Sequence, residues 1–329
     1  MPHDAQHLIQ NAQAAEIARS ALGRLVKSVT RQGLSESGNA VFRIEMADGT
    51  FAVLRTAPGK KFAFTRRNLD VLRALGLPVQ NVLAAGQTAA GASFIILSWV
   101  DGRDLIYELG AMNDAQMTRL AEQVVDYQNR VLKLPAARRF GWAPIALSGP
   151  LERWTDVFGT PAQGNVHDGT TLGQLRRSLC GIRAKLEEYF AAVRPNPFLD
   201  DLTTRNVIVR EGALSGFIDV DFVCYGDPLL NVGATLASIA ADAPEGEFYG
   251  QELVRLWNPQ GQRRMALWFY AALWAIGTLA LNDCKNVPRA QALEAAARKW
   301  LQMAEDEGRV TVSLWPMGRT AAGQAREVA

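Results

Sequence analysis

Three polar residues in the second half of the chain have the types and spacing of a catalytic and metal-binding set. Asp201 stands five residues before Asn206, and Asp219 follows two short β-forming runs at residues 207–209 and 214–218. These runs predict an antiparallel hairpin, in which the beginning of the first strand lies about 5 Å from the end of the second. The sequence therefore predicts that Asn206 and Asp219 are neighbours, with Asp201 at the other end of a tight loop.

The chemistry of this set suits the handling of phosphate. An amide oxygen beside a carboxylate offers hard oxygen ligands to Mg²⁺, which takes few protein ligands and shares phosphate oxygens. Asp201 would lie close by, placed to accept a proton. Asp and Asn are also common in turns and at strand ends. That alternative would account for any one of the three residues, but the spaced set favours the chemical interpretation.

The spacing resembles that of a known family. Asp-x-x-x-x-Asn, a strand hairpin and a further Asp form the catalytic and metal loops of protein kinases. Ile218-Asp219, followed by Gly-Asp-Pro at residues 226–228, resembles aminoglycoside phosphotransferases and related small-molecule kinases. The resemblance implies Asp201 as the base, Asn206 and Asp219 as metal ligands, and ATP and Mg²⁺ as cofactors. The implied reaction moves the γ-phosphoryl group of ATP to a hydroxyl of a small molecule.

Spacing also separates the other acidic residues of this segment. Asp201, not Asp200, stands five residues before Asn206. We expect Asp227 to brace the loop through hydrogen bonds. The role of Asp221 stays open at this level, with indirect support of the site as one alternative.

The same resemblance implies a nucleotide site nearer the N-terminus. A glycine-containing turn between two predicted strands would cover the phosphates with Ser35, Ser37 and Gly38, because small residues let backbone amides approach phosphate oxygens. Arg55 stands where a kinase strand carries its lysine, and it would grip the phosphates bidentately. Val53, on the same face of that strand, would form part of the roof over the adenine.

Residues 94–102 resemble the hinge of the family. There, backbone groups bind the adenine edge, and the resemblance implies the Ser98 carbonyl and the Val100 amide for that role. Trp99 is either a hinge side chain or a packing residue.

The chain also departs from the family pattern. Leu199 and Asn231 replace a histidine and an aspartate that are mainly architectural, and Asn68 stands where a helix would carry a glutamate paired with the lysine. Arg55 would then be positioned by Asn68, by Asp70 or by backbone. These departures leave a second interpretation, a pseudokinase-type module that binds nucleotide without turnover.

The elements expected to position these residues change character along the chain. Strands dominate up to Ser98, with an Asp48-Gly49 hairpin turn and a helix near residues 64–75. Long helical stretches are predicted further on, at residues 114–132, 173–193, 228–240 and 265–281. We therefore expect an α+β, two-lobed protein-kinase-like fold. Its predicted parts are an N-terminal nucleotide-binding lobe (1–98), a hinge (99–103), a helical lobe with the catalytic loops and acceptor site (104–317), and a frayed tail (318–329).

Composition excludes several other classes. Of 329 residues, 48% are hydrophobic, and 35 Lys and Arg against 33 Asp and Glu leave a net charge of +2, without the basic surplus typical of nucleic-acid binding. Three scattered cysteines favour a reducing compartment.

The apolar run at residues 265–281 predicts a buried helix, because it is shorter than the roughly 20 residues that a membrane span takes. A helical membrane-associated protein is the alternative. We expect a cytoplasmic protein with no membrane partner, either a monomer or a homodimer.

The acceptor is the least determined feature. An acidic patch for a polycationic acceptor, or an aromatic pocket, would fall in the helical lobe, although solvated loops and core packing are the more usual roles of such residues. The candidates are Asp242, Glu245, Glu247 and Asp283, and Trp154, Trp268 and Trp274. The family also covers choline, homoserine, fructosamine and macrolide kinases, so the resemblance does not choose the acceptor.

Overall fold

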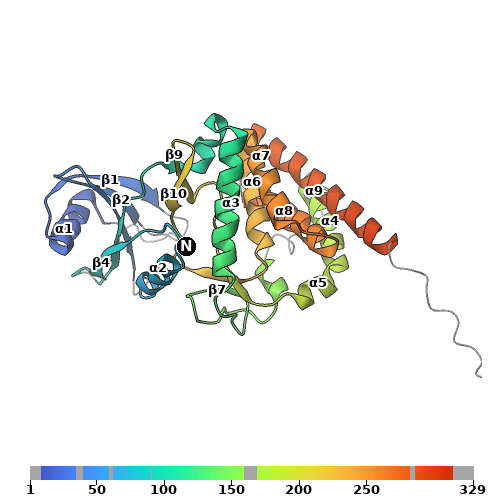
Figure 1. Ribbon diagram of the computed structural model, residues 1–329, viewed down its shortest axis with the longest axis horizontal. Coiled ribbons are helices and arrows are strands. Elements are labelled where there is room, and N and C mark those ends of the chain that lie inside the picture. The colour runs from blue at the N-terminus through green and yellow to red at the C-terminus, as the bar shows by residue number, and fades with distance from the viewer. Residues whose placement is uncertain are drawn as a thin grey trace, which may run out of the picture.

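The computed structural model describes residues 9–34, 40–58, 62–89, 91–158, 169–281 and 286–313. It has the predicted α+β, two-lobed arrangement, with a small β-rich N-lobe and a larger helical C-lobe (Figure 1). The chain passes from one to the other after residue 98. The finer domain boundaries stay a prediction.

The N-lobe is built on a five-stranded antiparallel sheet of order β1-β2-β3-β5-β4. Its strands are β1 (Val26–Leu34), β2 (Ala40–Met46), β3 (Phe51–Ala57), β4 (Val82–Gln87) and β5 (Ser93–Ser98). The expected turn at Asp48-Gly49 joins β2 to β3, and Gly49 adopts the left-handed φ of +82° that this turn requires.

The two faces of this sheet have different partners. Helix α1 (Asn11–Leu22) covers one face, where Ala14 and Ala18 pack with Phe42 and Leu54. Side chains alternate along a strand, so Val53 and Arg55 on β3 lie on the opposite face. That face turns toward α2 (Thr65–Ala74) and the C-lobe.

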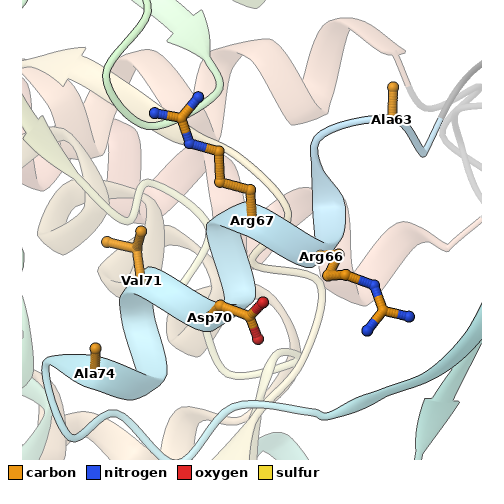
Figure 2. A pocket seen from close by; sticks show the side chains of 6 residues that line it. All are labelled: Ala63, Arg66, Arg67, Asp70, Val71 and Ala74. Atoms are coloured by element: carbon orange, nitrogen blue, oxygen red, sulfur yellow. The ribbon is translucent and has the colours of Figure 1, made fainter.

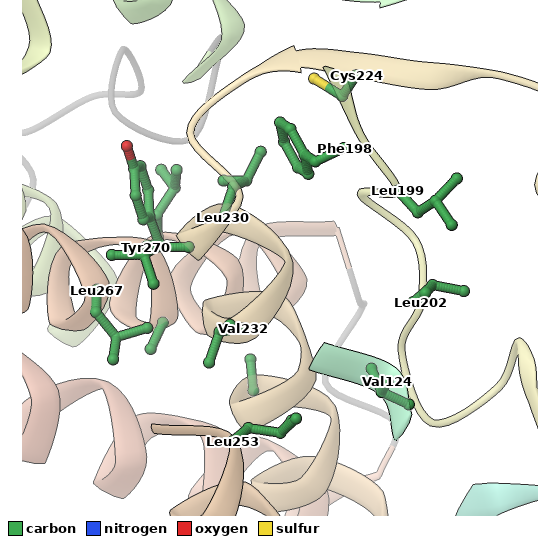
Figure 3. Packing of buried hydrophobic residues seen from close by; sticks show 14 of the residues in the cluster. Val124, Phe198, Leu199, Leu202, Cys224, Leu230, Val232, Leu253, Leu267 and Tyr270 are labelled. Carbon is green, nitrogen blue, oxygen red and sulfur yellow. The ribbon is translucent and has the colours of Figure 1, made fainter. Parts of the chain in front are cut away.

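The C-lobe consists mainly of helices. They are α3 (Asp114–Val131), α4 (Thr171–Lys185), α5 (Glu187–Ala192), α6 (Leu229–Asp242), α7 (Glu247–Trp257), α8 (Gln262–Leu281) and α9 (Val287–Ser313). Gly233 lets α6 approach α8 closely, since a Cβ there would lie 2.7 Å from the amide nitrogen of Ala271. Figure 3 shows Leu230 and Val232 of α6 beside Leu267 and Tyr270 of α8.

Helix α8 corresponds to the apolar run at residues 265–281. Within the described residues it is the one helix long and apolar enough to cross a membrane by length and composition, and 67% of its apolar window is buried inside the protein. Its neighbours are α6, α9 and α4. The arrangement is that of a core helix.

Hydrogen bonds join the two lobes beyond the connecting segment. The amide of Phe217 donates to the carbonyl of Pro78 at 2.8 Å. The Arg130 side chain, from α3, donates to the carbonyl of Leu75 just after α2 at 3.2 Å. The segment that follows α2 is therefore fixed to the C-lobe.

Candidate active site

A β-hairpin fixes the relative positions of Asn206 and Asp219. Strands β9 (Val207–Arg210) and β10 (Ala213–Phe217) pair antiparallel, as the sequence predicts. One further hydrogen bond extends the ladder, from the amide of Ile218 to the carbonyl of Asn206 at 3.0 Å. The residue before β9 and the residue two positions beyond β10 therefore lie at the same end of the hairpin.

The backbone of Asp219 is unusual for a residue with a side chain. Its φ is +56°, in the left-handed region, which Asp tolerates better than most residues do. The turn directs the chain from β10 toward β11 (Val223–Gly226). The Asp219 side chain is 52% exposed, so its carboxylate is accessible to a ligand.

The loop before β9 holds Asp201 close to Asn206. The Asn206 Nδ2 donates to the Asp201 carbonyl at 2.9 Å. The amide oxygen of Asn206 is thereby turned away from this backbone group. The Asp201 carboxylate accepts a hydrogen bond from Thr203 Oγ1 at 3.3 Å. The loop thus brings together a carboxylate, an amide oxygen and, across the hairpin, the Asp219 carboxylate.

The surroundings of Asp201 favour its protonated form. Desolvation by the loop, followed by repulsion from Asp200 and Asp219, raises the pKa of Asp201 to about 7. The pKa of Asp200 is raised to about 6, mainly by burial. A carboxylate that titrates near neutral pH is suited to act as a general base.

The two adjacent aspartates face different neighbours. The Asp200 carboxylate accepts a hydrogen bond from Trp142 Nε1, on strand β7 (Gly141–Ala143). Its backbone carbonyl accepts from Asn231 Nδ2 at 3.0 Å. Asp200 is therefore held by the C-lobe framework, while Asp201 lies beside Asn206.

The residues that depart from the family pattern have structural partners. Leu199 is buried in the core with Phe198 and Leu202 (Figure 3). Its amide donates to Gln128 Oε1 at 3.0 Å, and Gln128 Nε2 donates to Asn231 Oδ1 at 3.3 Å. Gln128, which the sequence analysis did not single out, thus fastens the backbone of the catalytic loop to α3 and α6.

Asp227 braces the short connection between β11 and α6, as expected. It accepts hydrogen bonds from Tyr189 Oη at 2.6 Å, from Tyr270 Oη at 3.0 Å and from the amide of Leu229 at 3.0 Å. The carboxylate is buried, so these donors compensate its desolvation.

Arg55 reaches from β3 to the loop that carries Asp219. One terminal nitrogen lies 3.1 Å from Asp219 Oδ1 and the other lies 2.9 Å from Asp221 Oδ2. From the sequence we expect Asn68, Asp70 or backbone to position Arg55. The acidic partners in the structure are instead Asp219 and Asp221, because Asp70 points to solvent and pairs with Arg73 at 3.2 Å.

Asn68 contacts the same loop by a different route. Its Nδ2 donates to the backbone carbonyl of Asp221, and its Oδ1 accepts from the amide of Ile145 at 3.1 Å. Asn68 is fully buried. It therefore ties α2 to the C-lobe through backbone groups.

The nucleotide-site residues on the N-lobe are only partly described. Ser35, Ser37 and Gly38 lie outside the described residues. Val53 is paired with Leu97 across the strands and shares the face of Arg55. Its predicted place over the adenine stays a prediction.

The predicted hinge has a distinctive hydrogen bond. The Ser98 carbonyl accepts from Gln80 Nε2 at 2.8 Å, so one of its two lone pairs is already used. Val100 follows two residues later and is partly exposed. Trp99 packs against Phe51, with ring centroids 6.1 Å apart, which favours its role as a packing residue.

The acidic candidates for the acceptor site are largely neutralised. Asp242 lies 2.6 Å from Arg289 and 3.3 Å from Arg205, and Glu247 lies 3.5 Å from Lys299. Asp283 lies outside the described residues. Trp154 and Trp268 are core residues, whereas Trp274 is 40% exposed. Glu245 is exposed and forms no ion pair within the described part of the chain, so it alone of the three described acidic candidates keeps an unpaired charge.

A shallow depression of about 500 Å³ lies on the outer face of α2 (Figure 2). The exposed residues Arg66, Arg67 and Asp70 line it, whereas Asn68 of the same helix is buried. It contains none of the candidate catalytic or metal-binding residues.

The donor set at the end of the hairpin fits Mg²⁺. Among the described residues, no group of three or more His, Cys, Asp and Glu is arranged to hold a metal ion. A cation here would depend on one carboxylate and one amide oxygen. Mg²⁺ is commonly bound in this way, with phosphate and water oxygens completing its shell.

Fold and site together define the kinase-like class of phosphotransferases. The model of the phosphotransferase enzyme family matches residues 30–268. The chain belongs to this family. No curated protein sequence matches the chain.

Solved structures share the fold at low identity. A ligand-free thermostable mutant of aminoglycoside phosphotransferase APH(4)-Ia is 16% identical, with 88% of this chain and 98% of that chain covered and a TM-score of 0.65. A putative fructosamine-3-kinase from Thermobifida fusca YX-ER1 is 17% identical, with coverages of 88% and 98% and a TM-score of 0.55. The GDP and kanamycin complex of APH(2")-IIia is 14% identical, with coverages of 91% and 98% and a TM-score of 0.58.

Proposed function

We propose that this protein transfers the γ-phosphoryl group of ATP to a hydroxyl group of a small molecule. The observation that carries the proposal is the meeting of Asp201, Asn206 and Asp219 at one end of the hairpin, with Arg55 against Asp219. Family membership supports phosphoryl transfer. A structure of APH(4)-Ia holds ADP and hygromycin B, which supports an adenine nucleotide and a small hydroxylated acceptor.

Each residue has a distinct part in this proposal. Asp201 orients the acceptor hydroxyl and takes its proton, for which a pKa of about 7 is well suited. Asn206 and Asp219 hold Mg²⁺, which when bound neutralises charge on the phosphates. Arg55 adds positive charge from the N-lobe side. Catalysis of this kind depends on positioning and electrostatic stabilisation.

The nucleotide part of the proposal extends to the N-lobe. Ser35, Ser37 and Gly38 would cover the phosphates, Val53 would contact the adenine, and Ser98 and Val100 would bind its edge.

We infer a cytoplasmic protein that needs neither a membrane nor nucleic acid. Gel filtration would distinguish a monomer from a homodimer.

A second candidate function is nucleotide binding without turnover. It rests on the ion pair between Arg55 and Asp219. In this pair the arginine binds the carboxylate that is expected to hold the metal ion. Binding of Mg-ATP without phosphoryl transfer to any acceptor would favour it.

The test compares neighbouring aspartates. Wild type, Asp201→Asn and Asp200→Asn are assayed for ATP-dependent phosphorylation of a panel of hydroxylated metabolites and antibiotics. We expect Asp201→Asn to lose about 10²- to 10⁴-fold in kcat, the usual contribution of a general base. Asp200→Asn is expected to keep most of the activity, because its side chain binds Trp142. Equal turnover in wild type and Asp201→Asn would contradict the proposal.

A further inference from the structure

The two terminal nitrogens of Arg55 face different surroundings. One Arg55 nitrogen lies 2.9 Å from the Asp221 carboxylate, and the Asp221 side chain is only 9% exposed. The other Arg55 nitrogen lies 3.1 Å from the Asp219 carboxylate, and the Asp219 side chain is 52% exposed. The Arg55 side chain is 13% exposed, and its guanidinium lies over the ring of Phe62, 5.6 Å from its centroid. One side of Arg55 is therefore sealed in the protein, while the other is open to ligands.

Asp221 is held in place by residues of α2. Asn68 donates to its backbone carbonyl, and the Thr65 side chain donates to its carboxylate. Thr65 and Asn68 are both buried, and Asn68 is itself fixed by the amide of Ile145 at 3.1 Å. The Asp221 carboxylate is therefore a fixed point to which an N-lobe side chain is attached.

The burial of the two carboxylates decides which pair can be exchanged. Removing one partner from a buried ion pair is costly, since the other charge stays desolvated. An exposed pair contributes little and exchanges readily. A phosphate oxygen can therefore replace Asp219 on Arg55 far more easily than it can replace Asp221.

We propose that Asp221 is the positioning residue for nucleotide binding: it holds one terminal nitrogen of Arg55 while the other passes from Asp219 to a phosphate oxygen. The inference rests on the proposed nucleotide site and adds the residue that prepares it. It also gives a reason for arginine on β3. A lysine ammonium is a single point charge, whereas a guanidinium can bind two oxygens at opposite ends of its fork.

A double-mutant cycle on nucleotide affinity tests this role. ATP binding is measured by calorimetry with excess EDTA, so that neither turnover nor a metal contributes, for wild type, Asp221→Asn, Arg55→Gln and the double variant. We expect Asp221→Asn to weaken ATP binding about tenfold in the wild-type background and less than about twofold in the Arg55→Gln background. Asp70→Asn is the matched control, because Asp70 lies on α2 but pairs with Arg73; it should bind ATP as wild type does.

The outcomes separate this inference from the proposed function. Equal weakening by Asp221→Asn in both backgrounds would overturn the inference while leaving nucleotide binding intact. Absence of ATP binding by the folded wild type, both with EDTA and with excess Mg²⁺, would overturn both. Arg55→Lys gives an independent measurement that leaves Asp221 unchanged: we expect it to bind ATP several-fold more weakly than wild type, and unchanged affinity would overturn the inference.

Discussion

Arg55 and Asp219 form an ion pair of 3.1 Å between a strand of the N-lobe and the loop that follows β10 in the C-lobe. The pair brings the cation expected to bind phosphate to a carboxylate expected to bind Mg²⁺. The two groups come from segments more than 160 residues apart, so the fold itself assembles the site.

The rate should depend on the ionisation of Asp201. Its pKa is raised to about 7, and the base acts in its ionised form, so activity is present above pH 7 and is lost as the pH falls. We expect kcat/KM to drop about tenfold per pH unit well below pH 7. The measurement is a pH profile of kcat/KM between pH 5 and 9. A profile that is level from pH 5.5 to 7.5 would contradict the assignment.

Asp201 should also lower stability at alkaline pH. Because its folded-state pKa lies above the usual value of 3.8, the folded protein binds more protons than the unfolded chain between about pH 4 and 7, and stability falls as the pH rises through this window. Asp201→Asn removes this charge. We expect the variant to be about 1 kcal/mol more stable than wild type at pH 8, a modest gain for a partly exposed group, and to lose this advantage near pH 4.

Chemical denaturation at the two pH values measures this difference. Asp306→Asn, an exposed change on α9, serves as the control and should show little difference. An Asp201→Asn variant that is less stable than wild type at pH 8 would show that the carboxylate has favourable interactions in the folded state.

Asn68 should be important for stability. Asn68→Ala would leave two buried backbone groups, the Asp221 carbonyl and the Ile145 amide, without their side-chain partner. We expect a loss of about 2–4 kcal/mol in the free energy of unfolding. Asp70→Ala, on the exposed side of the same helix, is the matched control and should change it by about 0.5 kcal/mol or less. Equal effects of the two substitutions would show that the Asn68 hydrogen bonds contribute little.

Local sequence patterns were sufficient for much of the fold. Alternation and turn chemistry predicted the β9–β10 hairpin, and helical periodicity located α2, α3, α6 and α8 to within a few residues. The predicted helix at residues 173–193 is instead α4 and α5, because the backbone leaves helical geometry at Leu186. The periodicity of apolar residues continues across this break, so the sequence pattern does not predict where α4 ends and α5 begins.

Through-space partners could not be predicted from the same patterns. Strands β7, β8 (Asn196–Phe198) and β11 form a small sheet. Their three or four residues are too few for a periodic signal, and their partners are far apart in sequence. Gln128 binds Leu199 across 71 positions. The one local signal for Asp221 was its position two residues after Asp219. Its contact with Arg55 depends on how β3 packs against the segment between β10 and β11.

We propose that Asn206 and Asp219 share a metal ion beside the nucleotide phosphates, with Asp201 facing the acceptor. The most direct measurement is a crystal structure with Mg²⁺ and a non-hydrolysable ATP analogue. We expect a metal ion coordinated by Asn206 Oδ1 and an Asp219 carboxylate oxygen. The γ-phosphate should lie on the Asp201 side of that ion. A nucleotide bound elsewhere, or a metal ion that contacts neither residue, would contradict it.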